Sequence, residues 1–243
     1  MNTKPEYGTL IVAEDASALA STAADRLLGW ATETPGPVRI CLSGGSTPRR
    51  TYQELAGPRL VRRFPWPRVH WFWGDERFVP PDHPESNFRM AREAMLAAAP
   101  VPPENIHPVP TVGMSVDEAA AAYAAALQRV YGDAVLQRGT PLFDVCLLGL
   151  GDDGHTASLI PGEPELQERT RWVAAVGHGR PEVRITLTYP VIDASRHIAF
   201  LVSGAGKQKM LHEVRSGSST VPAAQLAPWG DLVFIADRDA AGT

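Results

Sequence analysis

The sequence predicts an α/β fold with a doubly wound, mostly parallel sheet and helices on both faces. Short apolar runs typical of buried strands alternate along the chain with longer segments at helical spacing. Glycine-rich or charged segments follow several of these runs, as is typical of the ligand-binding edge of open α/β sheets. The 243 residues are 44% hydrophobic and 21% charged, so we expect residues 1–243 to form a single domain with a substantial core.

The first half of the chain already shows the alternation. A short apolar run predicts a strand over Thr9–Ala13, and Ala, Leu and Arg at helical spacing predict a helix from Asp15 to Trp30, capped by Asp15 or Ser17. Thr34-Pro-Gly-Pro37 breaks this helix. The next predicted elements are a strand over Val38–Leu42, a helix ending at about Leu60, a strand over Val69–Trp73 and a helix over Ser86–Ala99.

The second half continues the pattern after a proline-rich stretch. Pro100–Pro110 is the one candidate linker, but it is short, and the strands on either side are expected in the same sheet. An alanine-rich segment predicts a helix over Asp117–Tyr131. The remaining predicted elements are strands over Phe143–Leu148, Trp172–Val176, Arg184–Thr188, His197–Val202 and Leu232–Ala236, with helices over about Lys207–Arg215 and Ala223–Leu226.

Composition limits the possible partners. The net charge of −4 gives no reason to expect nucleic acid, so an anionic ligand requires a local basic pocket. Cys41 and Cys146 lie in apolar strand-like runs, which predicts buried free thiols and a cytoplasmic location. We expect no membrane association, because there is no leader-like start and no segment of spanning length. The histidines lack metal-ligand spacing, so no metal is expected. Nothing in the sequence specifies an oligomeric state.

One segment delivers a single histidine from the end of a predicted strand. Gly149-Leu-Gly-Asp-Asp-Gly-His155 follows Phe143–Leu148, and a histidine there can exchange a proton near neutral pH. The alternative is that His155 caps a helix or bonds backbone in a tight turn. The segment also fits G-x-G-x-x-G. Asp152 and Asp153 would place negative charge where a pyrophosphate needs bare amides, so dinucleotide binding is disfavoured and no cofactor is expected.

A second segment, Ser43-Gly-Gly-Ser-Thr-Pro48, is typical of a phosphate cradle. Its glycines let the backbone approach a ligand closely, Ser46 or Thr47 can cap the next helix, and Pro48 suits the first helical position. Such a helix N-terminus offers free N–H groups and a favourable dipole to a phosphate. The alternative is an ordinary turn between strand and helix. The expected ligand contacts are Gly44, Gly45, Ser46 and Thr47.

Charged residues follow other predicted strands. Asp75, Glu76 and Arg77 come directly after Val69–Trp73, with Asn87 at the next helix start. This is either a solvated ion cluster or a site that orients a guanidinium for a phosphate and binds sugar hydroxyls. Arg184 opens a later strand, and Lys207 follows a glycine turn that is not a P-loop. Taken separately, each is a surface cation; a lysine at a helix start can also act as a point charge on an anion.

Together these segments resemble the 6-phosphogluconolactonases of the glucosamine-6-phosphate isomerase/6-phosphogluconolactonase family, from about residue 10 to 236. The His155 segment is the most specific part. The Gly-Gly-Ser-Thr-Pro loop is shared with glucosamine-6-phosphate deaminase and ribose-5-phosphate isomerase, so it indicates the Rossmann-like, sugar-phosphate isomerase type of fold more than the reaction. Ile160 stands where the family usually has Phe. The deaminase loop continues into an Asn-Glu pair, whereas Ala157-Ser158 follows here, which favours the lactonase.

The resemblance implies hydrolysis of 6-phospho-D-glucono-1,5-lactone to 6-phospho-D-gluconate in the oxidative pentose phosphate pathway, with no metal or cofactor. It implies that His155 is the general base and that Asp153 or Asp152 orients it, with Asp75 and Glu76 left open as further candidates. The alternatives are an isomerase or deaminase of the same fold that uses Asp75 as base, and a non-catalytic sugar-phosphate sensor. The implied substrate contacts are Gly44, Gly45, Ser46, Thr47, Asp75, Arg77, Asn87, Arg184 and Lys207.

Overall fold

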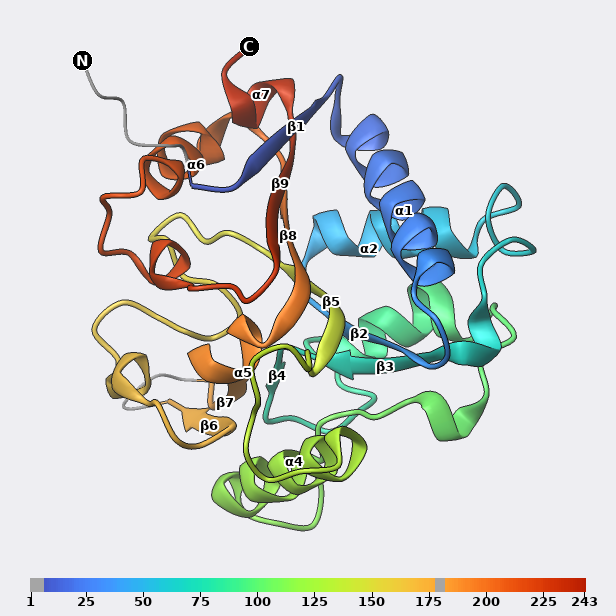
Figure 1. The fold of residues 1–243 in the computed structure, drawn as a ribbon, viewed down its shortest axis with the longest axis vertical. Helices are drawn as coiled ribbons and strands as arrows, with labels where there is room; N and C mark the ends of the chain where they lie inside the picture. The colour runs from blue at the N-terminus through green and yellow to red at the C-terminus, as the bar shows by residue number, and fades with distance from the viewer. Residues whose placement is uncertain (1–6, 178–181) are drawn as a thin grey trace.

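A six-stranded parallel sheet forms the centre of the fold (Figure 1). The computed structural model describes residues 7–177 and 182–243; the start of the chain considered for a leader, residues 1–6, lies outside them. The strand order is β1-β9-β8-β5-β2-β3. Helices cover both faces of this sheet, so the predicted fold class is confirmed. The strands are β1 (Thr9–Ala13), β2 (Val38–Leu42), β3 (Val69–Trp73), β5 (Phe143–Leu148), β8 (Ser195–Val202) and β9 (Asp231–Asp237).

A second, smaller sheet lies beside the first and differs from the prediction. It contains β4 (Asp75–Arg77), β7 (Arg184–Leu187) and β6 (Val173–Val176) in the order β4-β7-β6, and its pairs are antiparallel. The sequence analysis expected β6 and β7 in the same mostly parallel sheet as the other strands, and it did not predict β4. Three charged residues are untypical of a strand, and β4 forms because β7, far along the chain, supplies its partner. Gly74 joins the sheets: its N–H donates to Leu42 O (2.9 Å) and its C=O accepts from Leu187 N (2.9 Å).

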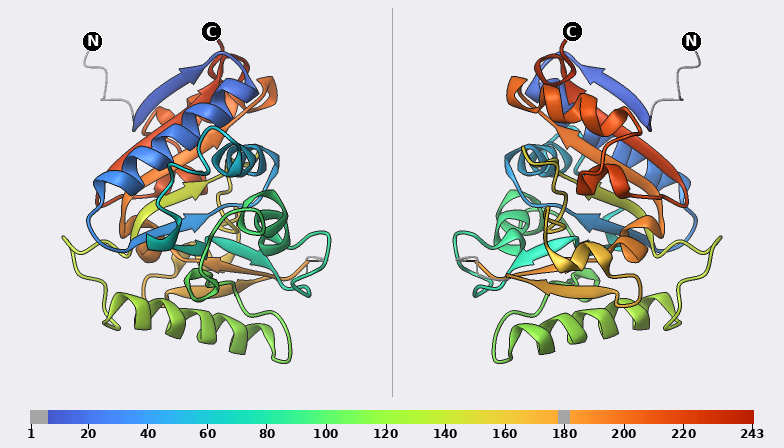
Figure 2. Two further views of the ribbon diagram at one scale, coloured as in Figure 1. Left: turned by 90° about the vertical axis from the view of Figure 1, so that its right-hand side faces the viewer. Right: turned by 90° about the vertical axis from the view of Figure 1, so that its left-hand side faces the viewer.

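The helices surround both sheets. Figure 2 shows α1 on one face of the main sheet and α6 on the opposite face, while α4 packs against β6 and β7 of the small sheet. Two short helices, α5 and α7, were not predicted because each is only about one turn long. The α-helices are α1 (Ala16–Glu33), α2 (Ser46–Ala56), α3 (Asn87–Ala91), α4 (Val116–Tyr131), α5 (Tyr189–Asp193), α6 (Gln208–Arg215) and α7 (Arg238–Ala241).

Several helix ends differ from the sequence prediction. Asp15 caps α1, as one of the two predicted options, by accepting from the N–H groups of the next turn. α2 ends at Ala56 rather than near Leu60 because Pro58 disfavours helical backbone at the residue before it. The predicted helix over Ser86–Ala99 is α3 followed by a wider π-helical turn. The 3₁₀ and π turns are η1 (Trp66–Arg68), η2 (Arg92–Leu96, π), η3 (Pro103–Asn105), η4 (Pro164–Gln167), η5 (Ala205–Lys207) and η6 (Pro222–Gln225), the last in place of the helix predicted over Ala223–Leu226.

The core sits on both faces of the main sheet. Parallel strands buried on both faces are apolar along their whole length, and β5 is buried at every position. Trp71 and Trp73 are buried in this core. Cys41 and Cys146 are buried free thiols, as predicted, on directly paired positions of β2 and β5. Among the described residues, no helix has the length and apolar character needed to cross a membrane.

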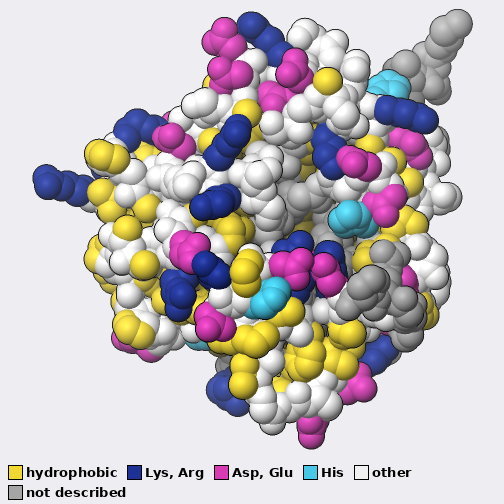
Figure 3. Space-filling model, turned by 180° about the vertical axis from the view of Figure 1, so that it is seen from behind, with side chains coloured by type: hydrophobic (Ala, Val, Ile, Leu, Met, Phe, Trp, Pro, Cys, Tyr) yellow, Lys and Arg dark blue, Asp and Glu magenta, His cyan; other side chains and the backbone are white. Residues whose placement is uncertain are grey.

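The strand order creates a crevice at one place on the sheet edge. Within the main sheet, β2 is followed by β3 on one side, whereas the next strand after β5 is β8, on the other side, and then β9. Open α/β sheets bind ligands where the strand order reverses in this way, outside the carboxyl ends of the strands. The segments after β2 and β5 therefore meet at the position where a ligand is expected. The surface seen in Figure 3 carries Lys and Arg side chains interspersed with Asp and Glu.

Candidate active site

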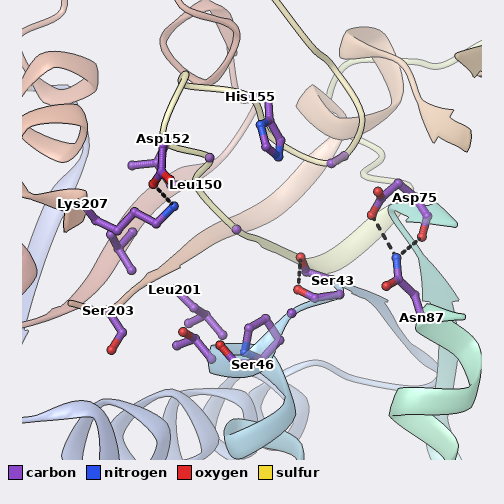
Figure 4. A pocket seen from close by; sticks show the side chains of 18 of the residues that line it. Ser43, Ser46, Asp75, Asn87, Leu150, Asp152, His155, Leu201, Ser203 and Lys207 are labelled. Carbon is purple, nitrogen blue, oxygen red and sulfur yellow. Dashed lines mark hydrogen bonds and ion pairs between the residues drawn. The ribbon is translucent and has the colours of Figure 1, made fainter. Parts of the chain in front are cut away.

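A cavity of about 370 Å³ lies at the carboxyl ends of β2, β5 and β8. It brings together the segments that the sequence analysis singled out, and every predicted site residue lines it except Asp153 (Figure 4). The lining residues that were predicted are Gly44, Gly45, Ser46, Thr47, Asp75, Arg77, Asn87, His155, Arg184 and Lys207. Those not singled out as ligands include Ser43, Leu150, Ala157, Leu201 and Ser203.

The cradle after β2, residues 43–48, is built from backbone. The helix α2 begins at Ser46, and Gly45 is its N-cap residue with a φ of +106°, which only glycine adopts without strain. Neither Ser46 nor Thr47 caps the helix, and Pro48 is its third residue, so these expectations were wrong. No side chain caps α2. The N–H groups of its first turn have no acceptor within the helix and lie at the cavity, which is the arrangement that binds an anion.

Gly44 is required for a different reason, which is space. A β-carbon at this position would lie 2.1 Å from Oδ1 of Asn87, so the Asn87 side chain lies directly against the glycine backbone. The amide of Asn87 donates to the backbone oxygen of Asp75 (2.9 Å). The cradle and the segment after β3 are thus packed together at one wall of the cavity.

His155 is oriented by one carboxylate. Its Nδ1 lies 2.6 Å from Oδ1 of Asp153, which also accepts the backbone N–H of His155 (3.1 Å). Burial acts to raise the pKa of Asp153, but these hydrogen bonds outweigh it and lower the pKa below its ordinary value. Because an ionised carboxylate only accepts, this contact selects the neutral tautomer with the proton on Nδ1 and the lone pair on Nε2. The side chain is 37% exposed and lines the cavity.

The loop that carries His155 closes on itself. Gly151 N–H donates to His155 O (2.9 Å), and a β-carbon on Gly151 would lie 2.1 Å from Nδ1 of His155. The hydroxyl of Thr156 donates to Gly149 O (3.0 Å). Gly154 has a φ of +79°. No helix starts directly after this loop, whereas the dinucleotide fingerprint opens one.

The other three candidate carboxylates have different partners. Asp152 pairs with Lys207, with Oδ1 2.5 Å from Nζ. Glu76 accepts the N–H of Asn87 (2.7 Å), the first residue of α3. Burial raises the pKa of Glu76, and backbone hydrogen bonds partly oppose that shift. Asp75 accepts from a serine hydroxyl and from Asn87. Of the four, Asp153 is the one in contact with His155.

Three cations line the cavity around the cradle. Arg77 and Arg184 are directly opposite each other in the β4–β7 pair, and Arg77 donates to Asn87 Oδ1 (3.0 Å). Nη2 of Arg184 lies 3.1 Å from Oε2 of Glu182. In Figure 4 Lys207 and Asn87 lie on opposite sides of Ser46. Nε of Arg77 is buried without a hydrogen-bond partner. No three His, Cys, Asp or Glu side chains in residues 7–177 and 182–243 are grouped to hold a metal ion.

Two supporting residues were missed in the sequence. Ser158 donates from Oγ to Oδ2 of Asp75 (2.7 Å), far away in the chain. Asp237 accepts from the hydroxyl of Ser203 (2.5 Å) and from the N–H of Gly204 (3.0 Å), and so shapes the turn that carries Lys207. The only signal for Asp237 was an acidic residue directly after a predicted strand. Ser158 entered the sequence analysis only through the comparison with the deaminase loop, and nothing indicated its contact with Asp75.

Comparisons with known proteins agree with this geometry. The family described as glucosamine-6-phosphate isomerases/6-phosphogluconolactonase matches residues 14–234. A 6-phosphogluconolactonase from Nostoc sp. is 41% identical over 238 residues, which cover 96% of each chain. The solved structure of 6-phosphogluconolactonase from Trypanosoma cruzi has a TM-score of 0.85 at 28% identity and covers 100% of this chain and 99% of that chain. A monomeric glucosamine-6-phosphate deaminase shares the fold, with a TM-score of 0.81 at 20% identity over 96% of this chain and 99% of that one.

Proposed function

The chain belongs to the glucosamine-6-phosphate isomerase/6-phosphogluconolactonase family, and from this premise we propose that His155 is the general base of a lactone hydrolase. The reaction is the hydrolysis of 6-phospho-D-glucono-1,5-lactone to 6-phospho-D-gluconate in the pentose phosphate pathway, the activity that its curated relatives carry in their names. The observation that carries the proposal is the 2.6 Å contact between Asp153 and Nδ1 of His155 at the cavity. This contact leaves Nε2 free to accept a proton.

The first step is attack of water on the lactone carbonyl. As the water oxygen bonds to C1, Nε2 of His155 takes a proton from it. Asp153 holds the ring in the required tautomer and stabilises the imidazolium that forms. The carbonyl oxygen becomes an oxyanion, which N–H groups or a cation of the cavity wall stabilise.

The second step opens the ring. The bond between C1 and the ring oxygen breaks, and the proton on Nε2 passes to that oxygen, which becomes a hydroxyl. The new carboxylic acid ionises and releases its proton to solvent. No further group is consumed, because a lactone is an activated ester and water is the only co-reactant.

The phosphate end of the substrate fits the cradle. The N–H groups at the start of α2 offer donors, and Arg77, Arg184 and Lys207 offer positive charge around them. Anchoring the phosphate there fixes the position of the carbonyl relative to His155. The other proposed contacts are Asp75 and Asn87, which present a carboxylate and an amide to sugar hydroxyls. The buried free thiols support a reducing, cytoplasmic location.

The direct test is an assay of the purified protein with freshly made 6-phosphogluconolactone. We expect acid release at a rate well above spontaneous hydrolysis, measured in a lightly buffered solution with a pH indicator. A parallel assay follows ammonia release from glucosamine 6-phosphate, the reaction expected if the protein is instead a deaminase of the same fold. Ammonia release without lactone hydrolysis would replace the lactonase proposal with the deaminase hypothesis. Activity in neither assay would favour a non-catalytic sugar-phosphate sensor.

A further inference from the structure

A buried hydrogen bond joins the His155 loop to the start of the small sheet. Oγ of Ser158 donates to Oδ2 of Asp75 at 2.7 Å, across a sequence separation of 83 residues. Ser158 is 0% exposed and Asp75 is 7% exposed. A hydrogen bond to a carboxylate is about twice as strong as one between neutral groups, and removal from water strengthens it further. The loop is therefore tied firmly to β4 at this point.

Ala157, which lies between His155 and Ser158 and lines the cavity, has an unusual backbone conformation. Ala157 has a φ of +48° and is the one non-glycine residue with positive φ among residues 7–177 and 182–243. Such a conformation costs free energy and persists only where the surroundings enforce it. Thr156 donates to Gly149 O on one side (3.0 Å), and the N–H of Ser158 donates to Oγ1 of Thr186 on the other (3.1 Å).

We propose that Asp75 is a positioning residue for His155, because its carboxylate holds Ser158 and thereby keeps Ala157 in the strained turn that places the imidazole over the cavity. Loss of this tie removes one of the contacts that hold the positive φ at Ala157, and a backbone shift two residues after His155 would displace the ring. The inference rests on the proposed role of His155 in lactone hydrolysis. It assigns Asp75 a function besides contact with a sugar hydroxyl.

The same contacts argue against Asp75 as a proton-abstracting base. Oδ2 accepts from Ser158, and Oδ1 accepts from Nδ2 of Asn87 at 3.3 Å. Each oxygen already accepts a hydrogen bond from the protein, so proton abstraction by Asp75 would have to compete with one of these donors. The geometry thus separates positioning from base catalysis, and the two roles predict different effects of substitution.

The first variant is Ser158→Ala, which removes the donor and leaves the Asp75 carboxylate in place. We expect kcat for lactone hydrolysis to fall roughly 10- to 100-fold, because small displacements of a catalytic group cost about that much, while KM changes less than about twofold. Its matched control is Ser195→Ala. Ser195 is equally buried and donates at the same distance, 2.7 Å, to Ile192 O, but it lies at the opposite end of the sheet.

Both serine variants lose one buried hydrogen bond, so both lower Tm, and the comparison isolates the effect on catalysis. We expect Ser195→Ala to keep kcat within about twofold of the wild type when assayed well below its Tm. If Ser158→Ala also keeps kcat within twofold while Tm falls as in the control, the hydrogen bond is structural and the inference is wrong.

The second variant is Asp75→Asn. The amide can still bond Ser158, with Nδ2 donating to Oγ, so a positioning role predicts a smaller loss of kcat than in Ser158→Ala, under about tenfold. An amide cannot take a proton, so a base role predicts a loss of roughly 10²–10⁴-fold, with Ser158→Ala close to the wild type. That second pattern would overturn the inference. It would leave the proposed lactonase function standing, since that function is judged on the wild-type protein.

Discussion

The two segments that meet at the cavity differ in the groups they present: one offers backbone N–H groups and the other a single imidazole. The cradle, residues 43–48 after β2, contains no charged or titratable side chain and presents backbone N–H groups at the start of α2. The loop after β5, residues 149–158, presents one imidazole and surrounds it with hydrogen bonds to Asp153, Gly149 and Asp75. Binding an anion needs several donors of roughly correct direction, whereas proton transfer needs one atom in one place.

This contrast implies that the two segments respond differently to substitution. Changes in the loop alter the orientation or protonation of His155, which is felt in the transition state and lowers kcat. Changes around the cradle weaken the hold on a phosphate that is bound equally in substrate and transition state, which raises KM. The predictions below test this division, beginning with the largest effect.

His155→Ala removes the group that the loop carries. We expect kcat for lactone hydrolysis to fall roughly 10²–10⁴-fold while KM changes little, because general-base catalysis is lost and the cradle is intact. The measurement is steady-state kinetics, with a thermal melt to show that the variant is folded. A rate near that of the wild type would show that His155 is not the general base. It would also contradict the division of roles between the loop and the cradle.

Asp153→Asn tests orientation without removing the imidazole. The amide can donate to Nδ1, which favours the tautomer with the proton on Nε2, and that nitrogen then cannot accept from water. We expect kcat to fall about 10²-fold. The matched control is Asp152→Asn, which removes the pairing with Lys207 and leaves the ring contact unchanged. A larger kcat loss in the control would mean that Asp152 assists His155.

Gly151→Ala tests whether the loop backbone seats the ring. The added β-carbon would lie 2.1 Å from Nδ1 of His155 and 2.7 Å from Oδ1 of Asp153, so both side chains must move. We expect kcat to fall roughly 10-fold or more. Gly149→Ala is the control in the same loop, because its β-carbon would meet Ser43 Oγ at an ordinary 3.7 Å. Equal losses in both would show that the loop tolerates no side chain rather than that Gly151 seats His155.

Lys207→Met tests the cradle side of the comparison. Removing the ammonium takes away one charge-assisted contact, which is worth about one factor of ten in affinity for a phosphate. We therefore expect KM to rise roughly tenfold, with kcat within about threefold of the wild type. Inhibition by inorganic phosphate, measured in the same assays, should weaken in parallel. A fall in kcat with constant KM would move Lys207 from phosphate binding to the chemical step.

The smallest predicted effect is a pH dependence of stability. The loop contains the titratable carboxyl group of Asp153, whereas the cradle contains no titratable side chain. The folded protein lowers the pKa of Asp153, so this group stabilises the fold above its ordinary pKa of about 3.9, and the contribution is lost as pH falls through the lower folded value. Because the side chain is half exposed, we expect less than about 1 kcal/mol. Urea unfolding at pH 6 and pH 3 should show that the difference between the wild type and Asp153→Asn shrinks in acid. A constant difference would contradict it.

Much of the fold follows from local sequence. The strands β2, β3 and β5 have the predicted bounds, because apolar runs between glycine, proline or charged residues have few alternatives in a buried sheet. The strand β4 could not be predicted, since Asp75–Arg77 is a strand only by virtue of its pairing with β7. A single turn such as α7 carries too few residues for a periodic signal.

The site shows the same limit. The sequence indicated which segments meet, because glycine-rich and charged segments follow parallel strands whose carboxyl ends share an edge. It left Asp152 and Asp153 as equal candidates, because the choice depends on how the turn at Gly151 directs each side chain. No signal indicated the contact of Ser158 with Asp75, since Asp75 lies 83 residues earlier and only the folded chain brings the two together.

The backbone construction of the cradle has a consequence for how this fold diverges. Main-chain donors survive most substitutions, provided that the two glycines that shape them are kept. A descendant protein can therefore keep the proposed phosphate cradle while the segment following β5 changes for another reaction. The deaminase with the same architecture is one example of a different chemistry on this scaffold. Exchanging that one loop between such proteins would measure how far the segment after β5 alone sets the reaction.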